Sequence, residues 1–274
     1  MHTNIFKILL TILNNNLFHY INQLDDSEKK IGILINGGDN YLEGCKYLNK
    51  LLDKVNTGKL KIRVEAIISN NWNGGVRKEA YDSGISFERI KYISTKGDNG
   101  EYLEEQLDYI QEVYQNIIKK YGLEYIFFVG WNEYITGILP NKSINTFIGN
   151  EENIYNGSNE NEIYMKLFED YKSGIINETY INICFQDQNN TKGPMIAKIP
   201  VNLENTKNIS DIKKCIYENK INNLGKVYEL ILTNDISWSG NKGDKLITND
   251  KKIKLKKYSN GIIFLNNNVA KSTE

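Results

Sequence analysis

A glycine-rich turn is the stretch of this chain whose residue types and spacing are best suited to bind a ligand. Gly37, Gly38, Asp39 and Asn40 follow the apolar run 31–35 and precede leucines and other apolar residues at helical spacing. Where a strand turns directly into a helix, the unpaired amides of the first helical turn point at whatever lies above the turn. The pattern predicts a phosphate or other anion site, and a plain reversal of the chain is the alternative.

Histidine, the usual proton carrier near neutral pH, is almost missing from the chain. The two histidines, His2 and His19, both precede the strand 31–35. The three cysteines, Cys45, Cys184 and Cys215, are odd in number and far apart, which favours a reducing compartment over a disulfide framework or a metal cluster. We therefore expect no metal site and a cytoplasmic location.

The charge balance and the N-terminal segment exclude two classes of partner. Lys and Arg together number 34 and are matched by 34 Asp and Glu, so the basic field needed for non-specific nucleic-acid binding is absent. The apolar block in residues 4–24 is too short to span a membrane and lacks a small-residue cleavage site. We predict an N-terminal helical extension, residues 1–29, that packs on the body, on a second copy of the chain or on another protein.

Strand-like and helix-like stretches alternate after this extension. Apolar or alternating runs predict strands at 31–35, 59–69, 89–94, 125–129, 143–147, 180–185 and 194–201. Helical spacing between them predicts crossover helices at 42–55, 76–83, 103–117 and 163–171. Strands joined through helices give right-handed crossovers, so we expect an α/β fold with a doubly wound, Rossmann-like, mostly parallel sheet. Ligands of such sheets bind beyond the carboxyl ends of the strands.

The C-terminal third predicts two helices and a β extension. Residues 209–217 and 224–232 have helical periodicity, and the runs 252–255 and 262–265 predict a small β-hairpin around Ser259, Asn260 and Gly261. The predicted organisation is therefore an extension at 1–29, an α/β domain at 30–235 and a C-terminal β extension at 236–274.

Five segments, in this order, carry a resemblance to a known family. KIGILINGGDNYLEG resembles a first strand with a G-N-G-S-N-L phosphate loop, and VEAIISNNWNGGVRKEAYDSGI a second strand with its loop and helix. YIFFVGWNEYITGILP is similar to V-V-L-A-G-F-M-R-I-L-S-P, and SINTFIGN to a strand reading I-N-I-H-P-S. ICFQDQNNTKGPMIAKIPV is similar to V-H-F-V followed by D-x-G-P and I-x-Q. Together they resemble the folate-dependent formyltransferases, most closely phosphoribosylglycinamide (GAR) formyltransferase, over about residues 31–235.

The resemblance implies formyl transfer from 10-formyltetrahydrofolate to the amine of a phosphorylated substrate such as GAR, a step of purine biosynthesis. By the resemblance, Asn145 is the catalytic asparagine. The phosphate-binding residues would be Gly37, Gly38, Asp39 and Asn40. The folate cofactor would contact Trp131, Asn132, Tyr134 and Ile135.

Two charged members of the family's catalytic triad are missing from the matching positions. The histidine position is Phe147, and the aspartate position, three residues before Pro194, is Thr191. A phenyl ring neither carries a proton nor donates a hydrogen bond. Asp187 lies on the same loop as Thr191 and could substitute for the missing carboxylate, although solvation is the ordinary fate of such a group. Asp39 and Glu133 also bring negative charge to the phosphate and folate loops.

These departures leave three hypotheses. The chain is a divergent GAR formyltransferase with another proton carrier, or a non-catalytic formyltransferase homologue (a pseudoenzyme) that binds a ligand or a protein. The third is a nucleotide-sugar N-formyltransferase, which the missing triad disfavours equally. The residues favour loss of the standard chemistry, because losing a positioned proton carrier costs about 10² to 10⁴ in rate and losing an oxyanion donor costs about 10² to 10³.

Overall fold

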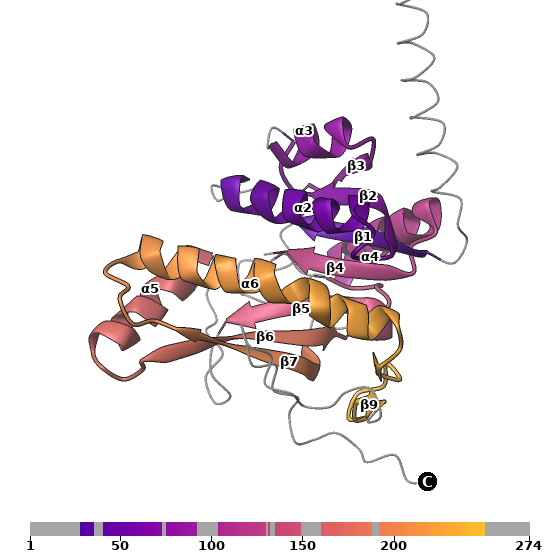
Figure 1. Ribbon diagram of the computed structural model, residues 1–274. Coiled ribbons are helices and arrows are strands. Elements are labelled where there is room, and N and C mark those ends of the chain that lie inside the picture. Colours follow the sequence, from indigo (N-terminus) through magenta and orange to yellow (C-terminus); the bar gives the residue numbers. More distant parts are fainter. Residues whose placement is uncertain are drawn as a thin grey trace, which may run out of the picture.

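The central feature of the computed structural model is a seven-stranded sheet with helices on both faces (Figure 1). The strand order is β3-β2-β1-β4-β5-β6-β7. The structure describes residues 28–35, 41–72, 75–91, 104–129, 131, 135–148, 160–187 and 192–249. The predicted N-terminal extension and the predicted hairpin around Ser259 to Gly261 lie outside these residues.

The strands follow the apolar runs of the sequence. They are β1 (Lys29–Ile35), β2 (Ile62–Ser69), β3 (Ser86–Arg89), β4 (Tyr125–Val129), β5 (Ser143–Ile148), β6 (Glu178–Gln186) and β7 (Lys192–Asn202). Strands β1 to β5 pair in parallel, whereas β5 with β6 and β6 with β7 are antiparallel. The expected doubly wound, mostly parallel sheet is confirmed, and two antiparallel strands extend one side of it.

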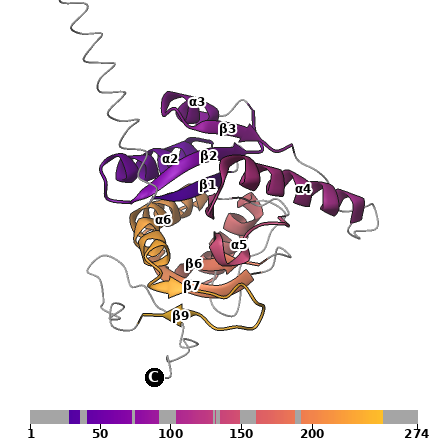
Figure 2. The same ribbon diagram turned by 90° about the vertical axis from the view of Figure 1, so that its right-hand side faces the viewer.

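Helices connect and cover these strands. They are α2 (Tyr41–Asn56), α3 (Gly75–Asp82), α4 (Glu104–Tyr121), α5 (Glu160–Lys172) and α6 (Ile209–Leu232), with a short 3₁₀ turn η1 (Pro140–Lys142) before β5. Figure 2 shows α2 and α6 on one face of the sheet and α4 on the other. Two further strands, β8 (Ile236–Ser237) and β9 (Ile247–Thr248), form an antiparallel pair, so a C-terminal β extension is present.

The apolar core is divided by the sheet into two clusters. Because neighbouring residues of a strand point to opposite faces, Phe127 of β4 belongs to the cluster under α2 and α6, whereas Phe128 belongs to the cluster under α4. In the first cluster Phe127 stacks on Tyr228 of α6 with ring centroids 3.8 Å apart. Burial of β4 on both faces explains why its sequence is a continuous apolar run.

Two predicted elements were wrong in detail. The third strand lies at Ser86–Arg89, where it pairs with Ala66 to Ser69 of β2, so it begins three residues before the predicted start at Arg89. Ile90 and Lys91 are not part of it, and residues 92–94 of the predicted strand lie outside the described residues. The two predicted C-terminal helices are one helix, α6. Across its polar middle, Asn219 Nδ2 donates to the carbonyl oxygen of Cys215 and Asn223 Nδ2 to that of Asn219, so these side chains bond within the helix instead of ending it.

Among the described residues, no helix combines the length and apolarity needed to cross a bilayer.

Candidate functional site

The candidate site lies where β1, β2, β4 and β5 come level at one edge of the sheet. Ile35 at the end of β1 pairs in register with both Ser69 of β2 and Val129 of β4. Phe127 of β4 pairs with Ile144, so Asn145 is one step further along β5 and level with Phe128. The fold thus places Asn145 at the carboxyl edge of the parallel strands, beside the ends of β1 and β4.

Both the amide nitrogen and the amide oxygen of the Asn145 side chain form hydrogen bonds. Its Nδ2 donates to Oε1 of Gln186 on β6 at 3.1 Å, and its Oδ1 accepts the backbone N–H of Thr146 at 2.7 Å. Asn145 is 5% exposed and Gln186 is 1% exposed. The amide is therefore held in one orientation by the neighbouring strand, and one of its two N–H groups is used there.

Further polar residues continue this face of the sheet across β6 and β7. Phe147 pairs in register with Asn182, and Asn182 pairs with Lys198. Both Asn182 and Lys198 are buried, and Lys198 Nζ lies 3.8 Å from the centre of the Tyr180 ring. A buried lysine and asparagine beside the Asn145 strand indicate a polar interior on this face, in contrast to the apolar interior on the α6 face.

Two of the predicted folate-binding residues are anchors of the core. Trp131 and Ile135 are 5% and 1% exposed and pack in the cluster under α4. Trp131 Nε1 donates to the hydroxyl of Tyr114 on α4 at 3.2 Å. These contacts fix the chain on either side of the loop, and contact of either residue with a folate remains a prediction.

The remaining predicted site residues lie outside the described part of the chain, and Phe147 is described only by its backbone. The residues outside the described part are Gly37, Gly38, Asp39, Asn40, Asn132, Tyr134 and Thr191.

Ser69, at the end of β2, is buried, and its hydroxyl accepts the backbone N–H of Asn71 at 3.3 Å. This bond shapes the start of the loop that follows β2 at the same edge of the sheet.

Sequence reasoning missed Gln186 and gave Asp187 only a minor place. Gln186 ends β6 directly after the apolar run Ile183 to Phe185, at the position where the resemblance has valine, and that change of type was the available signal. Asp187 follows it, is 7% exposed and lines a cavity beside β7. Within the described residues, no cluster of three or more His, Cys, Asp or Glu side chains could hold a metal ion.

The strand order, the flanking helices and the antiparallel pair that extends the parallel sheet define a protein of the formyltransferase fold. One solved structure with this fold is glycinamide ribonucleotide transformylase 1 from Symbiobacterium toebii, with a TM-score of 0.61 and 15% identity over 80% of this chain and 94% of that one.

Two other solved structures are similar. Phosphoribosylglycinamide formyltransferase from Anaplasma phagocytophilum has a TM-score of 0.54 and 18% identity over 76% of this chain and 88% of that one. A formyltetrahydrofolate deformylase from Pseudomonas putida KT2440 has a TM-score of 0.57 and 16% identity over 76% and 67% of the two chains. No family model and no curated protein matches the sequence. At these identities the likeness is one of fold.

Proposed function

We propose that this chain is a small-molecule-binding protein of the formyltransferase fold that has lost the standard formyl-transfer reaction. The ligand we expect is a folate of the 10-formyltetrahydrofolate type, a phosphorylated amine such as GAR, or both. Binding is expected beyond the carboxyl ends of β1 and β4, where doubly wound sheets hold their ligands.

The observation that carries this proposal is the hydrogen bond from Asn145 to Gln186. Amine attack on a formyl carbon builds negative charge on the formyl oxygen, and the reaction is fast only where a donor already points at that oxygen. In this chain the Asn145 amide nitrogen donates across the strands to Gln186 Oε1 at 3.1 Å. An amide held in this way serves to connect two strands, and one of its N–H groups can no longer donate to an oxyanion.

The absent proton carrier supports the same conclusion. The attacking amine must lose a proton and the departing folate nitrogen must gain one, which calls for a titratable group at the site. The two matching positions hold Phe147 and Thr191, and no histidine follows His19. Because groups of one catalytic unit do not contribute independently, the separate losses do not simply multiply.

A second candidate function is residual formyl transfer, or formyl removal by water, with Asp187 as the carboxylate. The burial of Asp187 directly after Gln186 favours this second function, because its carboxylate is withdrawn from solvent and is not an ordinary solvated group of a surface loop. The solved structures with this fold include both transformylases and deformylases by name, and a carboxylate that directly follows Gln186, the partner of Asn145, is the candidate for either reaction.

Binding calorimetry and a restored variant test the proposal. The wild-type protein is titrated with 5-formyltetrahydrofolate and with GAR, and we expect at least one of them to bind. The variant Phe147→His/Thr191→Asp supplies the missing groups, and adding Gln186→Val releases the Asn145 amide. We expect formyl transfer to emerge in these variants and to be absent from the matched control Phe147→Leu/Thr191→Asn.

Two outcomes count against the proposal. If neither ligand binds to the wild-type protein, the ligand site has been lost together with the chemistry. If the wild-type protein transfers formyl groups as fast as the restored variants, the standard reaction has been retained.

A further inference from the structure

Helices α2 and α6 lie on the same face of the sheet (Figure 2), and a narrow groove runs between them. The residues that line it are Tyr47, Lys50, Leu51, Lys54, Leu224 and Gly225. The tyrosine and the two leucines are buried, whereas Lys50 is exposed and Lys54 is half-buried. The groove is therefore apolar at its base and basic at its rim.

The turn that follows α2 brings a third lysine to this rim. Gly58 lies in the left-handed backbone region with a φ of 68°, and the backbone N–H of Leu60 donates to the carbonyl oxygen of Lys54 at 3.0 Å. This bond folds the segment after the helix back onto its last turn. The turn thereby places Lys59 beside Lys54, and Lys59 is exposed.

The basic rim is remote from the candidate site. Two residues after Leu60, Ile62 begins β2 and pairs with Lys29 at the start of β1. This end of the groove therefore lies towards the amino edge of the parallel strands, whereas Asn145 lies at their carboxyl edge.

The ammonium group of Lys54 lies against α6 at Gly225. A Cβ atom at Gly225 would lie 2.7 Å from Nζ of Lys54 and 3.2 Å from its Cδ. A side chain at this position would displace the ammonium group, and glycine is otherwise unfavourable in the interior of a helix. The absence of a side chain at Gly225 thus gives Lys54 room between the two helices.

The positive charges at the groove lack carboxylate partners. Lys50, Lys54 and Lys59 form no ion pair with any residue that the structure describes. Burial lowers the pKa of Lys54, and three nearby charges lower it further, all of them lysines: Lys226, Lys50 and Lys59. One lysine in the last turn of α2 is explained by the helix dipole. Several lysines that repel one another are not, and a bound anion would relieve their repulsion.

The surface around the groove favours an elongated anion with several phosphate groups. Lysine is a compact point charge that binds phosphate well, and the four lysines come from α2, the turn after it and α6. Among the described side chains of α2 and α6, no large apolar group is exposed, so the contacts that place a helix in a bilayer are missing. Tyr47 is 3% exposed and its hydroxyl bonds to Tyr228, so it offers no ring for a nucleobase to stack on.

We propose that the groove between α2 and α6 binds a short chain of phosphate groups, supplied by inorganic polyphosphate or by the tail of a nucleoside triphosphate. Lys54 and Lys50 would contact the chain at the groove, and Lys59 and Lys226 would balance its remaining charge. The proposal does not rest on the function proposed for the Asn145 site.

Calorimetry in the absence of divalent cations tests the class of ligand. Tripolyphosphate is expected to bind and to bind more weakly as NaCl is added, because salt screens exposed charges. Orthophosphate contacts fewer lysines and is expected to bind about tenfold more weakly. ATP is expected to bind with an affinity similar to that of tripolyphosphate, since the groove recognises the phosphates and not the base.

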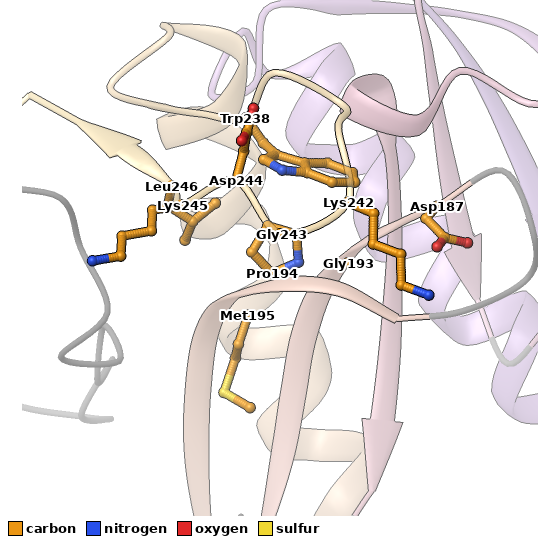
Figure 3. A pocket seen from close by; sticks show the side chains of 10 residues that line it. All are labelled: Asp187, Gly193, Pro194, Met195, Trp238, Lys242, Gly243, Asp244, Lys245 and Leu246. Carbon is orange, nitrogen blue, oxygen red and sulfur yellow. The ribbon is translucent and has the colours of Figure 1, made fainter.

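Two double variants with the same change of charge locate the site. Lys50→Gln/Lys54→Gln is expected to weaken tripolyphosphate binding about tenfold, because each exposed ion pair is worth about two- to fivefold. The matched control Lys242→Gln/Lys245→Gln removes two exposed lysines from the cavity beside β7 that Trp238 also lines (Figure 3), and it is expected to leave binding unchanged. Thermal unfolding without ligand verifies that both variants are folded.

Acetylation of lysines by an N-hydroxysuccinimide ester, followed by peptide mass spectrometry, reports on Lys54 directly. Tripolyphosphate is expected to protect Lys54 and to leave the acetylation of Lys245 unchanged. Absence of tripolyphosphate binding, equal effects of the two double variants, or equal protection of Lys54 and Lys245 would overturn the proposal. Orthophosphate binding as tight as that of tripolyphosphate, or ATP binding that is much tighter, would contradict a site for the phosphate chain alone.

Discussion

The amide nitrogen of Asn145 on β5 donates to the amide oxygen of Gln186 on β6 across a distance of 3.1 Å. Both side chains are almost fully buried, and the bond ties the last parallel strand to the antiparallel part of the sheet. A residue that the resemblance assigns to catalysis therefore has a structural partner. The bond that stabilises the sheet also occupies the amide group that formyl transfer would need, which is why we propose that this function has been lost.

Replacing Gln186 by valine should expose this structural role. The change leaves a buried N–H of Asn145 without its acceptor, which costs about 1–3 kcal/mol of stability. Urea unfolding of the wild-type protein and of Gln186→Val measures it. As a control, Gln115→Leu on the exposed face of α4 should change stability by less than about 0.5 kcal/mol. Equal stability of Gln186→Val and the wild-type protein would show that the bond to Asn145 contributes nothing.

The ion pair at the start of β1 should make stability depend on pH. Lys29 Nζ lies 2.9 Å from Oε1 of Glu124, and the backbone N–H of Lys30 donates to Oε2 at 3.0 Å. Burial works to raise the pKa of Glu124, but the bonds from Lys29 and Lys30 outweigh it, and the pKa lies below its ordinary value. Glu124 therefore stabilises the folded state above the unfolded pKa of about 4.3, and this contribution disappears as the pH falls through the lower folded pKa.

The variant Glu124→Gln tests this dependence. Because both groups of the pair are about 40% exposed, we expect a loss of only about 0.2–1 kcal/mol at pH 7. Unfolding curves measured from neutral to acid pH should converge for the two proteins below the folded pKa. A difference that persists undiminished into strong acid would assign the effect to packing and not to charge.

Two glycines should respond oppositely to alanine. At Gly193 a methyl group would meet the Phe185 carbonyl oxygen at 2.9 Å, so Gly193→Ala is expected to destabilise by about 1–3 kcal/mol. At Gly225 in α6 it would meet only the flexible end of Lys54, so Gly225→Ala should gain up to about 0.5–1 kcal/mol from helix propensity. Denaturation midpoints of the two variants measure the contrast. A stabilised Gly193→Ala protein would mean that β7 and Trp238 pack less closely than described.

The hydroxyl pair of Tyr47 and Tyr228 should hold α2 to α6. The two oxygens lie 3.2 Å apart, and burial raises the pKa of both hydroxyls, so both remain protonated in the folded protein. Tyr228→Phe leaves the Tyr47 hydroxyl without this partner and should cost about 1–2 kcal/mol. A double-mutant cycle with Tyr47→Phe separates the bond from the loss of each hydroxyl alone. Strict additivity in the cycle would rule out the interaction.

Much of the fold followed from local patterns in the sequence. The run Tyr125 to Val129 is apolar throughout because the strand is buried on both faces, and that pattern predicted a central strand. Gly84 and Gly174 end helices in the left-handed backbone region, which their sequence positions also indicated. The polar centre of α6 was misread as a break because bonds from asparagine to the preceding turn of a helix are not visible in composition.

The site was less predictable than the fold because its contacts join distant segments. Asn145 was identified through its strand, but its partner Gln186 lies 41 residues further along the chain, and only strand pairing brings the two together. Trp131 was predicted to bind folate, and its contact with Tyr114 became visible only once α4 was placed against β4. Aromatic residues at the end of a strand fit a ligand site and a core equally well, and tertiary packing decides between them.

The most direct test of the central claim is a single-turnover experiment with wild-type protein in excess over 10-formyltetrahydrofolate, in the presence and in the absence of GAR. Samples are quenched over hours, and both the formyl-folate and any formylated product are quantified. Our account predicts that the formyl-folate is recovered intact, beyond the loss seen without protein. Transfer of the formyl group to GAR or to water that depends on the protein, and that Asn145→Ala abolishes, would contradict it.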